Sequence, residues 1–281
     1  MSIVEPTVRT VHYGQPPSQT GELYLPPGTG PFPVVVLLHG GHWAAAFDRG
    51  QLTELAGDLV SHGVAVWNAE YRRVGEPGGG WPGTFEDVAA AVDAVDGMDA
   101  ALDPRRVVLA GHSSGGQLAV WAAHRATLPP EAPGSGPRVR PVGVVSLAGT
   151  LDLVAADAAR LGAELADPTA TLPAGAPAPA RPETLAGLPA EDGMVSLLLG
   201  GRYADVPERY GWTSPAHLAA SGVPALAVHG DSDVLLDVSY SRAYAGAEVE
   251  IVPGAGHFDL LDPDHPGWAI ARDWITARLA A

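Results

Sequence analysis

The sequence predicts an α/β fold, in which a mostly parallel sheet carries helices on both faces. Short apolar runs typical of buried strands recur along the chain, amphipathic helical segments separate them, and no internal repeat is visible. A length of 281 residues suits one large α/β domain or two small ones. We expect a single domain over residues 1–281.

The strands are predicted in chain order. Two short ones, at 7–13 and 21–25, precede an apolar run at 34–38 that is typical of a strand covered on both faces. Further strands are predicted at 64–68, 107–110, 142–148, 225–229 and 248–252. The helices between them comprise one capped by Asp48, one begun by the T-x-x-D pattern of Thr84 and Asp87, one at 117–125 and a closing amphipathic helix at 268–279.

Residues 150–211 break this alternation. Ala-rich helical pieces alternate there with Pro-rich stretches such as 172–182. Parallel sheets bind ligands beyond the carboxyl ends of their strands, so one interpretation is a cap inserted over that edge. A flexible surface excursion explains the Pro-rich middle equally well.

Composition narrows the possible functions. The net charge is −16 and every basic residue is an arginine, so the chain is expected to repel nucleic acid and anionic membranes. The chain has no Cys, no apolar run long enough to span a membrane and no visible signal peptide, and we expect a cytoplasmic protein. Its oligomeric state is left open, with a homodimer as one option.

The most informative stretch is the apolar run at 107–110 with the five residues that follow it. Gly111-His112-Ser113-Ser114-Gly115 fits the pattern G-x-S-x-G, and a helical segment comes directly after it. Strand, sharp turn and helix together are the context of a nucleophile elbow. We therefore predict that Ser113 is a nucleophile, with Gly111 and Gly115 required because a side chain there would collide with the neighbouring strand and helix.

Two later strands end in residues that can complete a catalytic triad. The strand at 225–229 leads into Asp231-Ser232-Asp233, and the strand at 248–252 leads into Gly256-His257. We predict that His257 takes the proton of Ser113 and that Asp233 holds the imidazole. Asp231 is the second choice for the acid, because it can brace the loop instead, and Asp237 is the third.

The loop after the strand at 34–38 is predicted to supply the oxyanion hole. It reads His39-Gly40-Gly41-His42-Trp43, and acyl transfer needs two backbone N–H groups aimed at the oxygen that becomes negative. We assign these donors to Gly41 or His42 together with Ser114. His39 is expected to brace the loop, and Glu70-Tyr71-Arg72-Arg73 to hold loops together through ion pairs.

Taken together, these motifs resemble the α/β-hydrolase family, and within it the small esterases. The resemblance runs from Pro33 to the C-terminus and is weakest across 150–211. The loop at 39–43 is similar to the His-Gly-Gly-Tyr-Trp loop of kynurenine formamidases (arylformamidases) and of related feruloyl-esterase-like carboxylesterases. It departs from that loop at His42, and Val234 stands where Pro often follows the acid. The resemblance implies hydrolysis of an ester or N-formyl amide without a cofactor.

The sequence thus predicts a serine hydrolase that cleaves a small carboxylic ester through an acyl-enzyme. The alternatives are an arylformamidase, a lyase or acyltransferase on the same triad, and a non-catalytic binding protein of this fold. The remaining histidines do not group into a metal site. Four residues are assigned to a substrate pocket, although a Trp is as often simply core: Trp43, Phe47, Trp81 and His112.

Overall fold

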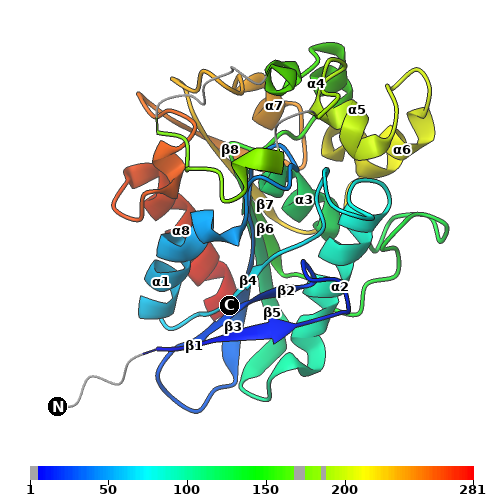
Figure 1. Ribbon diagram of the computed structural model, residues 1–281. Helices are drawn as coiled ribbons and strands as arrows, with labels where there is room; N and C mark the ends of the chain where they lie inside the picture. Colours follow the sequence, from blue (N-terminus) through cyan, green and yellow to red (C-terminus); the bar gives the residue numbers. More distant parts are fainter. Residues whose placement is uncertain (1–5, 168–174, 185–187) are drawn as a thin grey trace.

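In a computed structural model, which describes residues 6–167, 175–184 and 188–281, the chain forms one eight-stranded sheet in the order β1-β2-β4-β3-β5-β6-β7-β8 (Figure 1). Strands β1 and β2 run antiparallel to their neighbours, and all other neighbours are parallel. The strands are β1 Thr7–His12, β2 Thr20–Leu25, β3 Phe32–Leu38, β4 Ala65–Ala69, β5 Leu102–His112, β6 Gly143–Leu147, β7 Ala225–Gly230 and β8 Ala247–Val252. Each strand predicted from the sequence is therefore present.

The strand register brings the ends of parallel strands together. Leu38, the last residue of β3, pairs with Gly111 near the end of β5. In the same way Gly230, the last residue of β7, pairs with Val252 at the end of β8. The loops that follow these four strands consequently leave the sheet at one edge.

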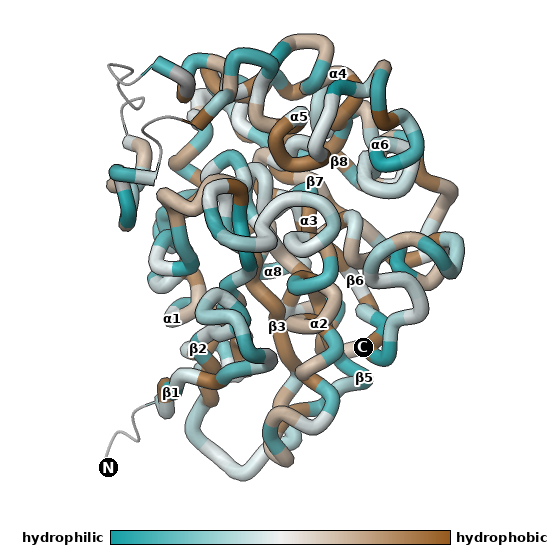
Figure 2. Tube along the Cα trace, turned by 45° about the vertical axis from the view of Figure 1, so that its right-hand side comes forward, coloured by the Kyte–Doolittle hydropathy of each residue, from teal (hydrophilic) through white to brown (hydrophobic). Residues whose placement is uncertain are grey.

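Helices cover both faces of the sheet. Helices α1 (Thr53–Ser61) and α8 (Pro266–Ala280) lie on one face, and α2 (Gly83–Met98) and α3 (Ser114–Ala123) lie on the other (Figure 1). The alternation of β3 reflects this, because Val34 and Val36 pack with α2 and α3 while Val35 and Leu37 pack with α1 and α8. In Figure 2, β3 is brown, the colour of hydrophobic residues, and lies inside the molecule.

The starts of two helices test the capping predictions. The Asp48 carboxylate accepts from Gly50 N–H at the short helix η1 (Arg49–Leu52) that precedes α1, which confirms its predicted cap. The T-x-x-D prediction is wrong, because α2 already begins at Gly83. The Asp87 carboxylate instead binds the Arg72 guanidinium at 2.6 Å, so an ion pair takes the place of a cap.

The segment between β6 and β7 forms short helices grouped at one end of the molecule, beyond the sheet (Figures 1 and 2). They are α4 (Leu153–Ala158), η2 (Ala163–Ala166), η3 (Pro182–Thr184), α5 (Met194–Leu199), α6 (Pro207–Thr213) and η4 (Pro215–His217). Helices α7 (Ser239–Arg242) and η5 (Asp259–Leu261) lie further along the chain. Residues 172–174 of the Pro-rich stretch fall outside the described residues. No helix in the described part of the chain is long and apolar enough to cross a membrane.

Candidate active site

Ser113 occupies a strained turn between β5 and α3. Its backbone angles are φ 56° and ψ −122°, a conformation that residues with side chains rarely adopt. A Cβ atom on Gly111 would lie 2.2 Å from the Gly115 carbonyl oxygen, and one on Gly115 would lie 2.1 Å from the Leu38 carbonyl oxygen. Both glycines are therefore required for the close approach of strand and helix, as predicted, and the turn has the geometry of a nucleophile elbow.

Asp233 and His257 meet although 24 residues separate them. His257 Nδ1–H donates to Asp233 Oδ2 over 2.6 Å, and Asp233 Oδ1 accepts the N–H groups of Leu235 and Leu236, each at 2.8 Å. Burial acts to raise the pKa of Asp233, but hydrogen bonds from His229, His257 and Leu236 outweigh it and hold the pKa well below its usual range. Asp233 is thus a carboxylate at neutral pH.

Asp231, the second choice for the acid, lies elsewhere in the same loop. Its carboxylate accepts from Gly254 N–H at 2.7 Å, and so links the loop after β7 to the turn after β8. The structure therefore gives Asp231 the bracing contact that was its alternative role. Asp237 accepts from Ser239 N–H at 2.9 Å, near the start of α7.

The elbow and the His257 loop are joined through His112. Its Nε2–H donates to the His257 carbonyl oxygen over 2.9 Å, and the two imidazole rings lie 4.6 Å apart. Among the described residues, the Ser113 hydroxyl itself forms no hydrogen bond to His257. Catalytic hydrogen bonds are often long in sites without substrate and shorten when it binds. His112 therefore keeps the loop of Ser113 next to the loop of His257.

The loop after β3 lies against the elbow and is strained as well. Gly41, His42 and Trp43 all have positive φ angles, of 105°, 54° and 57°. The Trp43 backbone N–H donates to Ser114 Oγ at 3.3 Å, and its indole N–H donates to Gln117 Oε1 at 3.0 Å. Within the described residues, no protein group accepts the backbone N–H of Gly41, His42 or Ser114.

His42 is held as a neutral imidazole beside these donors. Burial lowers the pKa of His42 to about 4, against an opposing attraction from Glu164, and the nearby His257 lowers it further. A Cβ atom on Gly162 would lie 3.1 Å from His42 Nδ1, so the start of η2 covers the ring. The loop after β3 is therefore in contact with the segment that was predicted to form a cap.

A buried ion network supports the same loop from the other side. His39 Nε2 lies 2.6 Å from Glu70 Oε1, and Nδ1 lies 2.8 Å from the Gly40 carbonyl oxygen. Both partners are hydrogen-bond acceptors, so the ring is held between them. Arg73 adds a cation 2.9 Å from Glu70. This arrangement confirms that His39 braces the loop and that residues 70–73 hold loops together.

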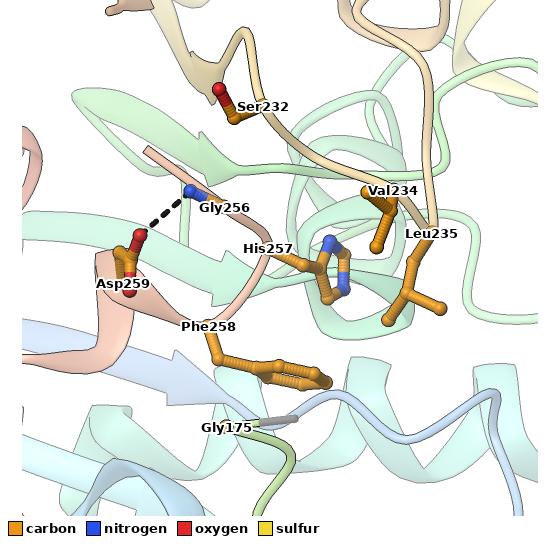
Figure 3. A pocket seen from close by; sticks show the side chains of 8 residues that line it. All are labelled: Gly175, Ser232, Val234, Leu235, Gly256, His257, Phe258 and Asp259. Carbon is orange, nitrogen blue, oxygen red and sulfur yellow. Dashed lines mark hydrogen bonds between the residues drawn. The ribbon is translucent and has the colours of Figure 1, made fainter. Parts of the chain in front are cut away.

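A small pocket of about 240 Å³ opens beside His257 (Figure 3). The side chains of Val234, Leu235 and Phe258 surround the imidazole, and Asp259 accepts from Gly256 N–H at 2.7 Å near the other end (Figure 3). The complete lining is Gly175, Ser232, Val234, Leu235, Gly256, His257, Phe258 and Asp259. Sequence reasoning missed this set, although Val234 and Phe258 directly follow the predicted acid and base.

None of the four residues assigned to a substrate pocket lines this one. Trp43 is fully buried and bound to Gln117, so the structure corrects its assignment: it supports the loop from within the core. Phe47 packs against Gly41, and Trp81 stacks on Trp212 at 6.0 Å. His112 is buried under the His257 loop. For Phe47 and Trp81 the pocket role stays a prediction.

The family of the chain follows from its sequence as a whole. A family model described as BD-FAE matches residues 22–247, which include the loop after β3, the elbow and Asp233. The chain belongs to the BD-FAE family. This is an α/β-hydrolase family, so the predicted fold is confirmed, whereas the closer likeness to arylformamidases stays a prediction. A comparison with curated proteins found no match.

Solved structures share the BD-FAE chain's architecture. A truncated carbohydrate esterase from gut microbiota is 22% identical, with a TM-score of 0.69 over 98% of this chain and 97% of that one. A bacterial heroin esterase is 20% identical, with a TM-score of 0.69 over 98% and 85% of the two chains. The esterase LipW from Mycobacterium marinum is 21% identical, with a TM-score of 0.64 over 98% and 81%. At these identities the likeness establishes the fold.

Proposed function

We propose that the protein is a serine hydrolase that cleaves a small carboxylic ester through an acyl-enzyme. Ser113 is the nucleophile, His257 the general base and Asp233 the residue that orients the imidazole. The observation that carries this proposal is the 2.6 Å hydrogen bond between Asp233 and His257, at the sheet edge where the strained Ser113 turn also lies. This contact and the position of the turn support a triad, because acyl transfer needs an oriented imidazole next to the nucleophile.

The reaction would proceed in two transfers. The Ser113 hydroxyl gives its proton to His257 Nε2 as its oxygen bonds to the ester carbonyl carbon, and the C=O electron pair moves onto the carbonyl oxygen. When that pair returns, the C–O bond to the leaving alcohol breaks and the alcohol takes the proton from His257. Water then repeats the sequence on the acyl-enzyme and releases the acid. Asp233 remains ionised and stabilises the imidazolium throughout.

The backbone N–H groups of Gly41, His42 and Ser114, which no protein group in the described part of the chain accepts, support an oxyanion hole at Gly41 or His42 and at Ser114. Such donors stabilise the negative oxygen because they are fixed in place before it forms, and each is typically worth about 10²-fold or more in rate. A neutral His42 suits this site, since a second positive charge would oppose the formation of the His257 imidazolium.

The pocket beside His257 fits the leaving alcohol, because the alcohol must receive its proton from that imidazole. Its apolar wall of Val234, Leu235 and Phe258 favours a leaving group with apolar surface. Residues 150–211 act in this proposal as a cap within one domain, which is supported by the contacts of Gly162 with His42 and of Gly175 with Phe258. The esterases among the solved structures of this fold favour an ester over other acyl substrates.

Turnover of p-nitrophenyl acetate by Ser113→Ala tests the proposal. We expect loss of nearly all turnover and of covalent labelling by a fluorophosphonate, while the melting temperature stays close to that of the wild type. Ser61→Ala, at an exposed serine at the end of α1, is the matched control and should keep both signals. Turnover or labelling retained by Ser113→Ala would overturn the assignment.

The same assay separates ester from formamide hydrolysis. The likeness of residues 39–43 to the arylformamidase loop favours N-formylkynurenine as the second substrate to test. We expect a higher kcat/KM for short-chain esters, because His42 replaces the Tyr of that loop. A preference for N-formylkynurenine would make the arylformamidase alternative correct. Product analysis in the presence of added alcohols separates hydrolysis from acyl transfer.

A further inference from the structure

A second histidine contacts the carboxylate that holds His257. His229, near the end of β7, is fully buried, and its Nε2 lies 3.2 Å from Asp233 Oδ2, the oxygen that also accepts from His257. The same nitrogen lies 2.9 Å from the Leu236 carbonyl oxygen, and Nδ1 lies 2.7 Å from Ser241 Oγ. Every polar atom of the His229 ring thus faces a partner.

The partners of His229 determine where its proton lies. The Leu236 carbonyl and the Asp233 carboxylate can only accept, so Nε2 carries the hydrogen. Ser241 is itself fully buried, and its hydroxyl has a hydrogen to donate, which the free lone pair of Nδ1 accepts. Within the described residues this arrangement gives each of these groups a partner of the opposite kind.

We propose that His229 is a positioning residue for the catalytic acid. Resting on the function proposed above, the inference is that its N–H fixes Asp233 with Oδ2 toward His257 and draws negative charge from that oxygen. The His257 N–H donates to this oxygen, and the His229 N–H, which donates to the Leu236 carbonyl, lies beside it at 3.2 Å, so each N–H dipole weakens the attraction that the oxygen exerts on the other. Removing His229 should therefore loosen the position of Asp233 and at the same time strengthen its pull on the His257 imidazolium.

These two effects have different signatures. A looser carboxylate lowers kcat with little change in KM, because the contact acts on the reacting groups and not on substrate binding. A stronger pull on the imidazolium moves the acidic limb of the kcat/KM profile to higher pH. Damage that is merely structural lowers the amount of active protein and moves neither quantity per active site.

The ionisable groups near His257 and Asp233 do not obscure the acidic limb of the kcat/KM profile. Among the described residues, the ionisable groups near this pair include His112 at the end of β5, His42 in the loop after β3 and Asp259 in η5. Glu164 in η2 lies next to His42, and Asp237 before α7 lies next to His229. Burial lowers the pKa of His112 to about 3 and that of His42 to about 4, so both stay neutral above pH 5. The Ser239 side chain and backbone N–H lower the pKa of Asp237, which stays ionised.

His124 provides a matched control. It is also fully buried, and its ring likewise bonds one backbone carbonyl and one hydroxyl, those of Ala219 and Tyr244, at 2.9 and 2.8 Å. It does not touch Asp233. His124→Leu therefore removes the same kinds of structural bonds as His229→Leu and leaves the carboxylate intact.

The experiment compares His229→Leu, His229→Gln and His124→Leu with the wild type between pH 5 and 8. Activity on p-nitrophenyl acetate is expressed per site labelled by a fluorophosphonate. We expect His229→Leu to lower kcat about tenfold through the lost contact with Asp233, with KM nearly unchanged. Its acidic midpoint should rise by about half a pH unit. His229→Gln, which keeps an N–H donor, should recover most of both effects, and His124→Leu should show neither.

A second readout does not depend on turnover. The short His257–Asp233 hydrogen bond should give a low-field proton resonance in the ¹H NMR spectrum, which His229→Leu moves and His124→Leu does not. Should His229→Leu fail to fold, Ser241→Ala, which frees the ring to change tautomer, should move the resonance and the midpoint in the same direction by less. If the wild type is active and His229→Leu behaves like His124→Leu, the inference about His229 is overturned and the proposed function is not. A wild type without ester turnover overturns the proposed function, and the resonance then decides about His229.

Discussion

Replacing Glu70 with glutamine should destabilise the protein in a manner that depends on pH. The Glu70 carboxylate is buried beneath the loop after β3, where it contacts the His39 imidazole at 2.6 Å and the Arg73 guanidinium at 2.9 Å. It also accepts the backbone N–H of Tyr71 at 3.1 Å. A glutamine of the same shape removes the charge that the buried Arg73 guanidinium and the His39 ring both contact.

The magnitude follows from the pKa of Glu70. Burial acts to raise it, but the charge and hydrogen bond of His39 and the charge of Arg73 outweigh burial and lower the pKa from 4.5 to about 2. Ionised Glu70 therefore contributes ~3 kcal/mol to the free energy of unfolding at pH 7. Because the folded pKa is the lower one, this contribution is complete above pH 4.5 and declines as the pH falls towards 2. At pH 3.5 it should be ~2 kcal/mol.

Denaturant unfolding of the wild type and Glu70→Gln at pH 7 and pH 3.5 measures both values. We expect a loss of ~3 kcal/mol at pH 7, which shrinks by ~1 kcal/mol at pH 3.5. Glu86→Gln is the control, because Glu86 is 54% exposed and lies 3.9 Å from Arg72, and its loss should stay within ~0.5 kcal/mol. An equal loss at both pH values, or a loss below ~1 kcal/mol at pH 7, would refute the role of the charge.

Two further pairs of variants test the site and the turn that carries it. Asp233→Asn should lower kcat by ~10⁴-fold because it favours the wrong imidazole tautomer, whereas Asp231→Asn should cost far less; steady-state kinetics that reverse this order would make Asp231 the acid. Gly115→Ala should prevent stable folding, since its Cβ would meet two backbone carbonyls within 2.3 Å. Gly57→Ala, with open space around it in α1, should instead raise the free energy of unfolding by ~0.5–1 kcal/mol in the same denaturant experiment.

The parts of the site that could be predicted are those fixed by strand ends. The loops that begin at His39, Ser113, Asp231 and Pro253 each follow an apolar strand, and parallel strands place their carboxyl ends at one edge. The order of motifs along the chain therefore predicted which loops meet. The sequence favoured Asp233 over Asp231 without deciding between them, and the structure shows Asp233 bound to His257 and Asp231 bound to the Gly254 N–H.

The packing of individual side chains could not be predicted in the same way. Trp43 and Trp81 are large aromatic residues in loops near the site, and a sequence does not show whether such a ring lies in a pocket or in the core. The structure buries Trp43 completely because its indole N–H finds an acceptor in Gln117 on α3. Asp87 was predicted to help begin a helix for a similar reason: the sequence does not show that Arg72, from an earlier segment, lies next to it in space.

His229 was visible in the sequence without a reason to single it out. It lies within the predicted strand, four residues before Asp233. The alternation of side chains along a strand does not show whether a residue of the following loop comes back close to the strand. Gly230 allows the loop after β7 to pass close to the loop after β8, because a Cβ atom at Gly230 would lie 2.0 Å from the Ala255 carbonyl oxygen. A histidine that ends a buried strand, with Gly after it and Asp three residues further on, is the signal that could have found it.

The two strained loops of the site support each other. Ser113 holds a positive φ angle after β5, and Gly41, His42 and Trp43 do so after β3, so both segments cost conformational energy that the surrounding structure must supply. Trp43 supplies it by joining them: its backbone N–H reaches the first turn of α3, its indole reaches the second, and its ring is buried in the core. The free energy gained by burying that ring therefore holds the proposed oxyanion donors against the nucleophile. Packing of the Trp43 ring in the core and the placement of the proposed oxyanion donors therefore depend on each other.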